Sequence, residues 1–126
     1  MKRIMILTLT AALVGAPLVA FARCTADVDV GRSWEENGGF VQKARLRATV
    51  TRARPGAFAT VHVEARFHYE RSDGWTNAAS ASASTGIDTS QTSSEDFLID
   101  TRAINCSREK RCEIKDVEIF RVSCYD

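Results

Sequence analysis

The feature that most constrains the fold is a strict two-residue alternation over residues 58–69. Polar or charged residues occupy the even positions from Thr60 to His68, and apolar or aromatic residues occupy the odd positions. The odd-numbered residues are Ala59, Val61, Val63, Ala65, Phe67 and Tyr69. Successive side chains of a β-strand point to opposite faces, so this pattern predicts a long strand with one face in a core and the other in water. Such a strand needs paired neighbours, and we therefore expect a sheet protein.

A second alternation covers residues 40–51, and a Pro55-Gly56 turn separates it from the first. Proline sets the first turn angle and glycine accepts the positive second angle, which favours a type II turn. We expect this turn to join the two strands as an antiparallel hairpin. The hairpin would have a basic exposed edge, which we interpret as protection against edge-to-edge aggregation rather than as an anion site. The basic residues concerned are Lys43, Arg45, Arg47, Arg52 and Arg54.

The rest of the chain supplies further short strands before and after this pair. Residues 24–30 alternate and are followed by a turn cluster, 31–39, that contains Trp34. Residues 76–85 alternate alanine with serine, which has no helical stripe and predicts a strand with small inward side chains. Apolar residues 97–99 predict a buried strand, and residues 103–106 show a weaker strand pattern. The two faces of 112–125 are both partly apolar, which a bulge near Lys115 and Asp116 would explain.

Two connecting segments have the composition of loops. Residues 71–74 read as a turn that leads to Trp75, and residues 86–96 are rich in serine, threonine and acidic residues. We expect the 86–96 loop to be the most mobile part of the domain.

Seven candidate strands without a convincing helix predict an all-β fold. The expected architecture is an antiparallel β-sandwich of immunoglobulin or fibronectin type, and a small β-barrel is the alternative. The antibody pattern of two cysteines flanking a strand-borne tryptophan is absent from the sequence.

The first 22 residues have the pattern of a secretory signal peptide. A basic start, Lys2-Arg3, precedes an apolar run that ends in the small-x-small sequence Ala20-Phe21-Ala22. We expect residues 1–22 to be removed and residues 23–126 to form one domain of 104 residues in the periplasm or outside the cell. No membrane anchor is expected after cleavage. The remaining charge is close to neutral, which gives no reason to expect nucleic-acid binding.

Four cysteines in a small exported domain predict two disulfides. Three connectivities are possible, and the spacing alone does not select one. We favour Cys24 with Cys124, which would join the first strand to the last, and Cys106 with Cys112, which would close a short charged loop.

The sequence holds no recognisable catalytic or cofactor motif, and it gives no metal or cofactor site. His62 and His68 lie on one polar strand face at a distance of roughly 20 Å, too far apart to share a metal ion. We interpret them as exposed or cross-strand-paired side chains. With all four thiols oxidised, no cysteine nucleophile remains.

We therefore expect a non-enzymatic binding module whose partner is another protein. An inhibitor or immunity protein for a cell-envelope enzyme would be one instance, with the 71–77 turn carrying Trp75 or the 86–96 loop as the contact surface. The alternatives are a secreted effector or hydrolase that uses His62 or His68 with a carboxylate such as Asp88, and a structural subunit of a surface assembly. The sequence leaves the oligomeric state open.

Overall fold

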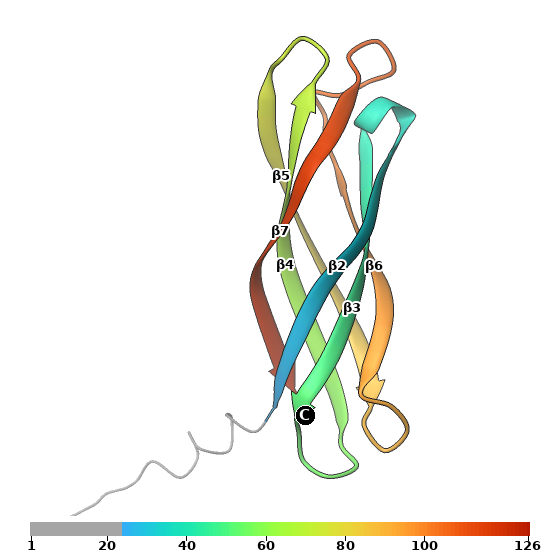
Figure 1. Ribbon diagram of the computed structural model, residues 1–126, viewed down its shortest axis with the longest axis vertical. Helices are drawn as coiled ribbons and strands as arrows, with labels where there is room; N and C mark the ends of the chain where they lie inside the picture. The colour runs from blue at the N-terminus through green and yellow to red at the C-terminus, as the bar shows by residue number, and fades with distance from the viewer. Residues whose placement is uncertain (1–23) are drawn as a thin grey trace, which may run out of the picture.

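The computed structural model describes residues 24–126 and contains two three-stranded antiparallel sheets packed face to face (Figure 1). One sheet has the order β2-β3-β6 and the other has the order β5-β4-β7. The strands are β2 (Thr25–Glu36), β3 (Val41–Arg52), β4 (Phe58–Arg71), β5 (Thr76–Asp88), β6 (Ser94–Arg102) and β7 (Cys112–Tyr125). The fold is therefore the predicted all-β sandwich. The expected signal peptide, residues 1–22, lies outside the described residues.

Along the chain, the first two strands belong to one sheet, the next two belong to the other, and the last two are divided between the sheets. The first two strands form a hairpin through the short 3-10 turn η1 (Asn37–Gly39), and β4 and β5 form a hairpin in the other sheet. β6 then returns to the first sheet and β7 to the second.

The predicted hairpin between residues 40–51 and 58–69 is wrong. β3 pairs with β2 and β6, and β4 pairs with β5 and β7, so the two strands lie in different sheets. The Pro55-Gly56 turn does form, since the Ala57 amide donates to the Arg54 carbonyl at 3.0 Å and Gly56 has φ +70°. The turn carries the chain from the sheet of β3 to the sheet of β4. This crossing lets the apolar faces of the two strands pack against each other in the core.

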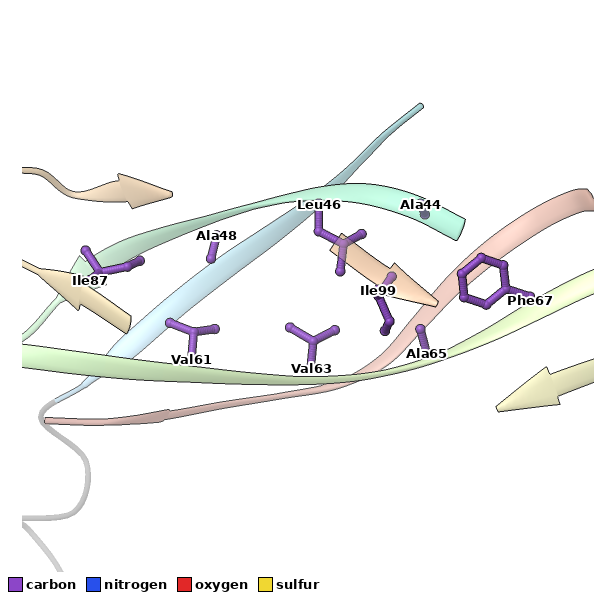
Figure 2. Close-up of a cluster of buried hydrophobic side chains, with 9 residues drawn as sticks. All are labelled: Ala44, Leu46, Ala48, Val61, Val63, Ala65, Phe67, Ile87 and Ile99. Atoms are coloured by element: carbon purple, nitrogen blue, oxygen red, sulfur yellow. The ribbon is translucent and has the colours of Figure 1, made fainter. Parts of the chain in front are cut away.

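The core lies between β3 and β4, as Figure 2 shows. Leu46 and Ala48 point from β3 towards Val61 and Val63 of β4, and all four side chains are fully buried. The remaining members of the cluster are Ala44, Ala65, Phe67, Ile87 and Ile99. The inward side chains are thus the odd positions of the alternation in β4, as the pattern predicts.

The basic side chains of β3 do not form a free edge, because β3 is the central strand of its sheet. Arg47 donates from Nε to Oδ1 of Asp96 on β6 at 2.9 Å, and Lys43 lies 3.4 Å from Glu36 on β2. Asp96 consequently has a lowered pKa, caused first by this hydrogen bond from Arg47. Two of the basic side chains of β3, Lys43 and Arg47, are therefore paired with carboxylates of the neighbouring strands.

Several strand boundaries in the structure differ from those predicted from the sequence. β2 continues through the expected turn cluster to Glu36, so Trp34 lies in a strand. The expected loop 86–96 shrinks to residues 89–93, because β5 runs to Asp88 and β6 begins at Ser94. Residues 103–106 form a turn rather than a strand, and Leu98 in the expected buried run is 50% exposed.

Other local predictions are confirmed. β5 is an edge strand in which Ala79, Ala81 and Ala83 are half-buried, whereas the serines between them are exposed. β7 has two register shifts against β4, one at Lys115, as expected, and another at Phe120. The second bulge places Phe120 outward, where the Arg66 guanidinium lies 4.2 Å from its ring centroid.

Two disulfides close the described chain, in the pairing favoured from the sequence. Cys24 joins Cys124 with a Cα–Cα distance of 5.4 Å, and we call this the long disulfide. Cys106 joins Cys112 at 5.6 Å and forms the short disulfide. Disulfides persist in oxidising compartments, so both are consistent with a protein outside the cytoplasm. Among residues 24–126, no helix has the length and hydrophobicity needed to cross a membrane.

Candidate protein-interaction surface

Three connecting segments meet at one end of the sandwich, at the top of Figure 1. They are η1, the 72–75 turn between β4 and β5, and the 103–111 connection between β6 and β7. We refer to this region as the loop end. A second buried cluster lies beneath it and consists of Tyr69, Ala103, Cys106 and Cys112. The loops therefore rest on a small core of their own.

Trp75 is held in place at the loop end by its neighbours. Its ring lies edge-on to Tyr69 with centroids 6.2 Å apart, and the Arg71 guanidinium lies 4.6 Å above the indole. The Trp75 amide donates to Oδ1 of Asp73 at 3.2 Å. Trp75 nevertheless remains 36% exposed, so part of a fixed aromatic residue faces water.

Arg71 connects the 72–75 turn to the 103–111 segment. It donates from Nε to Asp73 at 3.0 Å and from Nη1 to the carbonyl of Asn105 at 3.2 Å. The hydrogen bond from Arg71 lowers the pKa of Asp73, and the bond from the Trp75 amide lowers it further. The same contact with Asp73 raises the pKa of Arg71. One guanidinium thus stacks on the tryptophan, neutralises the turn carboxylate and holds the neighbouring loop.

Ile104 is the most exposed large apolar side chain of residues 24–126, at 83%. It lies next to Asn105, whose carbonyl Arg71 binds, and its segment begins and ends with the buried residues Ala103 and Cys106. The Cys106 amide donates to the Ala103 carbonyl at 3.0 Å and closes this turn. Because both ends of the turn are anchored in the second core, Ile104 is held away from the protein.

The short disulfide loop is braced on both sides. The Ser72 amide donates to the Arg111 carbonyl at 2.8 Å, which links the loop to the 72–75 turn. On the other side η1 packs against it so closely that a Cβ on Gly39 would lie 2.7 Å from the Cys112 carbonyl oxygen. Within the loop, the Lys110 amide donates to the Ser107 hydroxyl at 2.9 Å. The loop backbone is therefore preorganised.

A groove of about 430 Å³ lies over the paired ends of β4 and β7, beside the short disulfide loop. Arg71 and Arg111 contribute basic groups to its wall, and Glu70 and Glu113 contribute carboxylates. Lys115, which also lines it, lies 3.1 Å from Glu113 and 3.7 Å from Glu70. The groove is polar and of mixed charge.

The two histidines are paired across strands, as we interpreted them. His68 Nε2 lies 2.8 Å from Oε1 of Glu118 on β7. His62 Nδ1 lies 2.7 Å from the Ser84 hydroxyl on β5, and its Nε2 lies 3.8 Å from Glu64. The Ser84, His62 and Glu64 row has the residue types of a hydrolase, but the His62 and Glu64 side chains are 35% and 31% exposed on an open sheet face.

Asp88, the carboxylate considered for a catalytic role, is not brought to either histidine. It lies opposite Phe58, four residues along β4 from His62. Its carboxylate accepts hydrogen bonds from the Ser90 hydroxyl at 2.6 Å and from the Ser90 amide at 3.1 Å, and both lower its pKa. Asp88 therefore shapes the 89–93 turn, and the segment 86–96 offers fewer free acidic groups than its composition indicates.

Sequence reasoning identified the Trp75 turn but missed Ile104. A single isoleucine in a segment with a strand-like pattern gave no signal of exposure, since exposure depends on how Ala103 and Cys106 are anchored. Within the described residues, no cluster of three or more metal-ligating side chains could hold a metal ion. Comparisons with protein-family models, curated proteins and solved structures gave no match.

Proposed function

We propose that this protein is a small exported binding module that recognises another protein through its loop end. An inhibitor or immunity-type protein for a cell-envelope enzyme is an instance of this function. The observation that carries the proposal is the display of Ile104 and Trp75 on loops that are fixed by the short disulfide, Arg71 and the second core.

An exposed apolar side chain gains free energy when a partner buries it, and a loop that is already rigid loses little entropy on binding. Burying a large aliphatic side chain contributes roughly 1.5–3 kcal/mol, which Ile104 does not obtain within its own chain. Tryptophan and arginine are enriched among the residues that dominate protein–protein affinity. A surface already fixed before binding loses little conformational entropy in the complex. These features support binding through a few central side chains.

Export is part of the proposal and is supported by the apolar, basic-headed sequence of residues 1–22 and by the two disulfides. Small domains of secreted and periplasmic proteins often depend on such bridges. Expression of the full chain with a reporter of oxidation would test it, because a cytoplasmic product would retain titratable thiols at all four cysteines.

Affinity capture from a cell-envelope extract with substituted baits tests the binding function. Ile104→Asp should weaken capture of a discrete partner at least about tenfold, which corresponds to a loss of 1.4 kcal/mol or more. Leu98→Asp is the matched control, since Leu98 is 50% exposed in the middle of β6, away from the loop end. A partner that is recovered equally with both variants, or the absence of any partner, would count against the loop end as the binding surface.

A further inference from the structure

The short disulfide loop carries a concentration of basic side chains without carboxylate partners. Arg108, Lys110 and Arg111 are all exposed, and Glu109 is the one acidic residue among them. Within residues 24–126, none of the three basic side chains has an ion pair within 4 Å. Arg102, at the end of β6 that leads to the loop, also has none. The short disulfide loop therefore carries excess positive charge.

Most basic side chains elsewhere in the described chain are engaged. A carboxylate lies within 4 Å of Lys43, Arg47, Arg54, Arg71, Lys115 and Arg121. Two further guanidinium groups, those of Arg32 and Arg66, lie over aromatic rings. Apart from the loop end, the exceptions are Arg45 and Arg52. Of the six basic groups of residues 24–126 without either contact, four lie in or next to the 103–111 connection that carries Ile104, namely Arg102, Arg108, Lys110 and Arg111.

We propose that the partner of the loop end is a protein segment that combines acidic side chains with an apolar one. The proposal rests on the function proposed above. Carboxylates of the partner pair with Arg108, Lys110 and Arg111, and the apolar side chain packs against Ile104. Guanidinium groups bind carboxylates with two parallel hydrogen bonds, which adds geometric selectivity. The local field also steers an acidic partner and raises its association rate.

The chemistry favours an acidic protein over nucleic acid or an anionic membrane. Polyanions are bound by basic groups spread along a tract, so that many phosphates are neutralised at once. Here the groove beside the loop has basic and acidic side chains side by side, so it offers no continuous basic track for a line of phosphates. The exposed aromatic ring of the loop end, that of Trp75, already has the Arg71 guanidinium stacked over it, so that face is closed to a nucleic-acid base. Discrete carboxylates around an apolar group fit these constraints.

Fluorescence anisotropy with a labelled hexapeptide of alternating glutamate and leucine tests the proposal. The test variant is Arg108→Glu/Arg111→Glu. The matched control is Arg45→Glu/Arg52→Glu, which changes the net charge equally at exposed residues away from the loop end. We expect binding to the wild type that weakens at least about tenfold in the test variant and at most about twofold in the control, and that weakens with added salt. Equal urea midpoints would show that both variants remain folded.

Equal weakening in the two variants would overturn the proposal, because net charge alone would then explain binding. Equal binding of a lysine–leucine hexapeptide, or tighter binding of single-stranded DNA or phosphatidylglycerol vesicles, would also overturn it. Affinity capture from the cell-envelope extract, described above, distinguishes a failure of this inference from a failure of the proposed function. A partner that depends on Ile104 but is retained by Arg108→Glu/Arg111→Glu leaves the function standing and refutes the acidic partner. Peptide binding through the loop, without an Ile104-dependent partner, refutes the function instead.

Discussion

The contact between η1 and the short disulfide loop can be tested with two matched glycine substitutions. Gly38 and Gly56 have the same φ of +70°. A Cβ on Gly56 would meet nothing within 4 Å, whereas a Cβ on Gly38 would overlap the Ser107 carbonyl group and lie 2.8 Å from the Arg108 Cα atom. The two sites therefore share the backbone cost of alanine and differ in the steric cost.

The expected magnitudes follow from these two contributions. Alanine in the left-handed region costs about 1–2 kcal/mol, which is the whole effect expected for Gly56→Ala. Gly38→Ala must also displace the Ser107 and Arg108 backbone, and overpacking of this kind costs about 1–3 kcal/mol more. We expect Gly38→Ala to lower the free energy of unfolding by about 2–5 kcal/mol in total.

Urea unfolding followed by tryptophan fluorescence measures both losses, and unchanged slopes would show that the unfolding transition is the same. Hydrogen exchange adds a local readout, because the Ser107 and Lys110 amides should lose protection in Gly38→Ala only. In a Cys106→Ser/Cys112→Ser background the loop can move aside, so the excess cost of Gly38→Ala should shrink. Equal losses for Gly38→Ala and Gly56→Ala would refute the proposed close packing.

Three further predictions concern the core, the long disulfide and the loop end. Phe67→Ala should destabilise the protein by about 3–5 kcal/mol in urea unfolding, because Phe67 is fully buried between the sheets. Replacing the long disulfide by two serines should cost about 4–5 kcal/mol on the chain-entropy model, since it spans 100 residues, and an unchanged midpoint would contradict this. The Arg71 contact lowers the pKa of Asp73, so its stabilising effect is complete above the ordinary aspartate pKa and is lost as pH falls through the lowered value. The indole N–H resonance of Trp75 should therefore stay constant from pH 7 to about 5 and shift only in more acidic solution, below about pH 4.

The alternation of residues 58–69 determined that β4 is a strand and which of its faces is buried. This follows because side-chain direction alternates along any extended chain, whichever strand lies beside it. The same reasoning identified the small inward face of β5, the turn before Trp75 and the bulge at Lys115. Cysteine number and position likewise pointed to the two disulfides of the sandwich.

Strand partners, by contrast, depended on tertiary packing. A Pro-Gly turn fits both a hairpin within one sheet and a crossing between two sheets, and only burial of Leu46 against Val63 across the core selects the crossing. The exposure of Ile104 could not be predicted for a similar reason. Its neighbours Ala103 and Cys106 are buried against Tyr69, which is distant in the sequence, and this burial decides that Ile104 faces water.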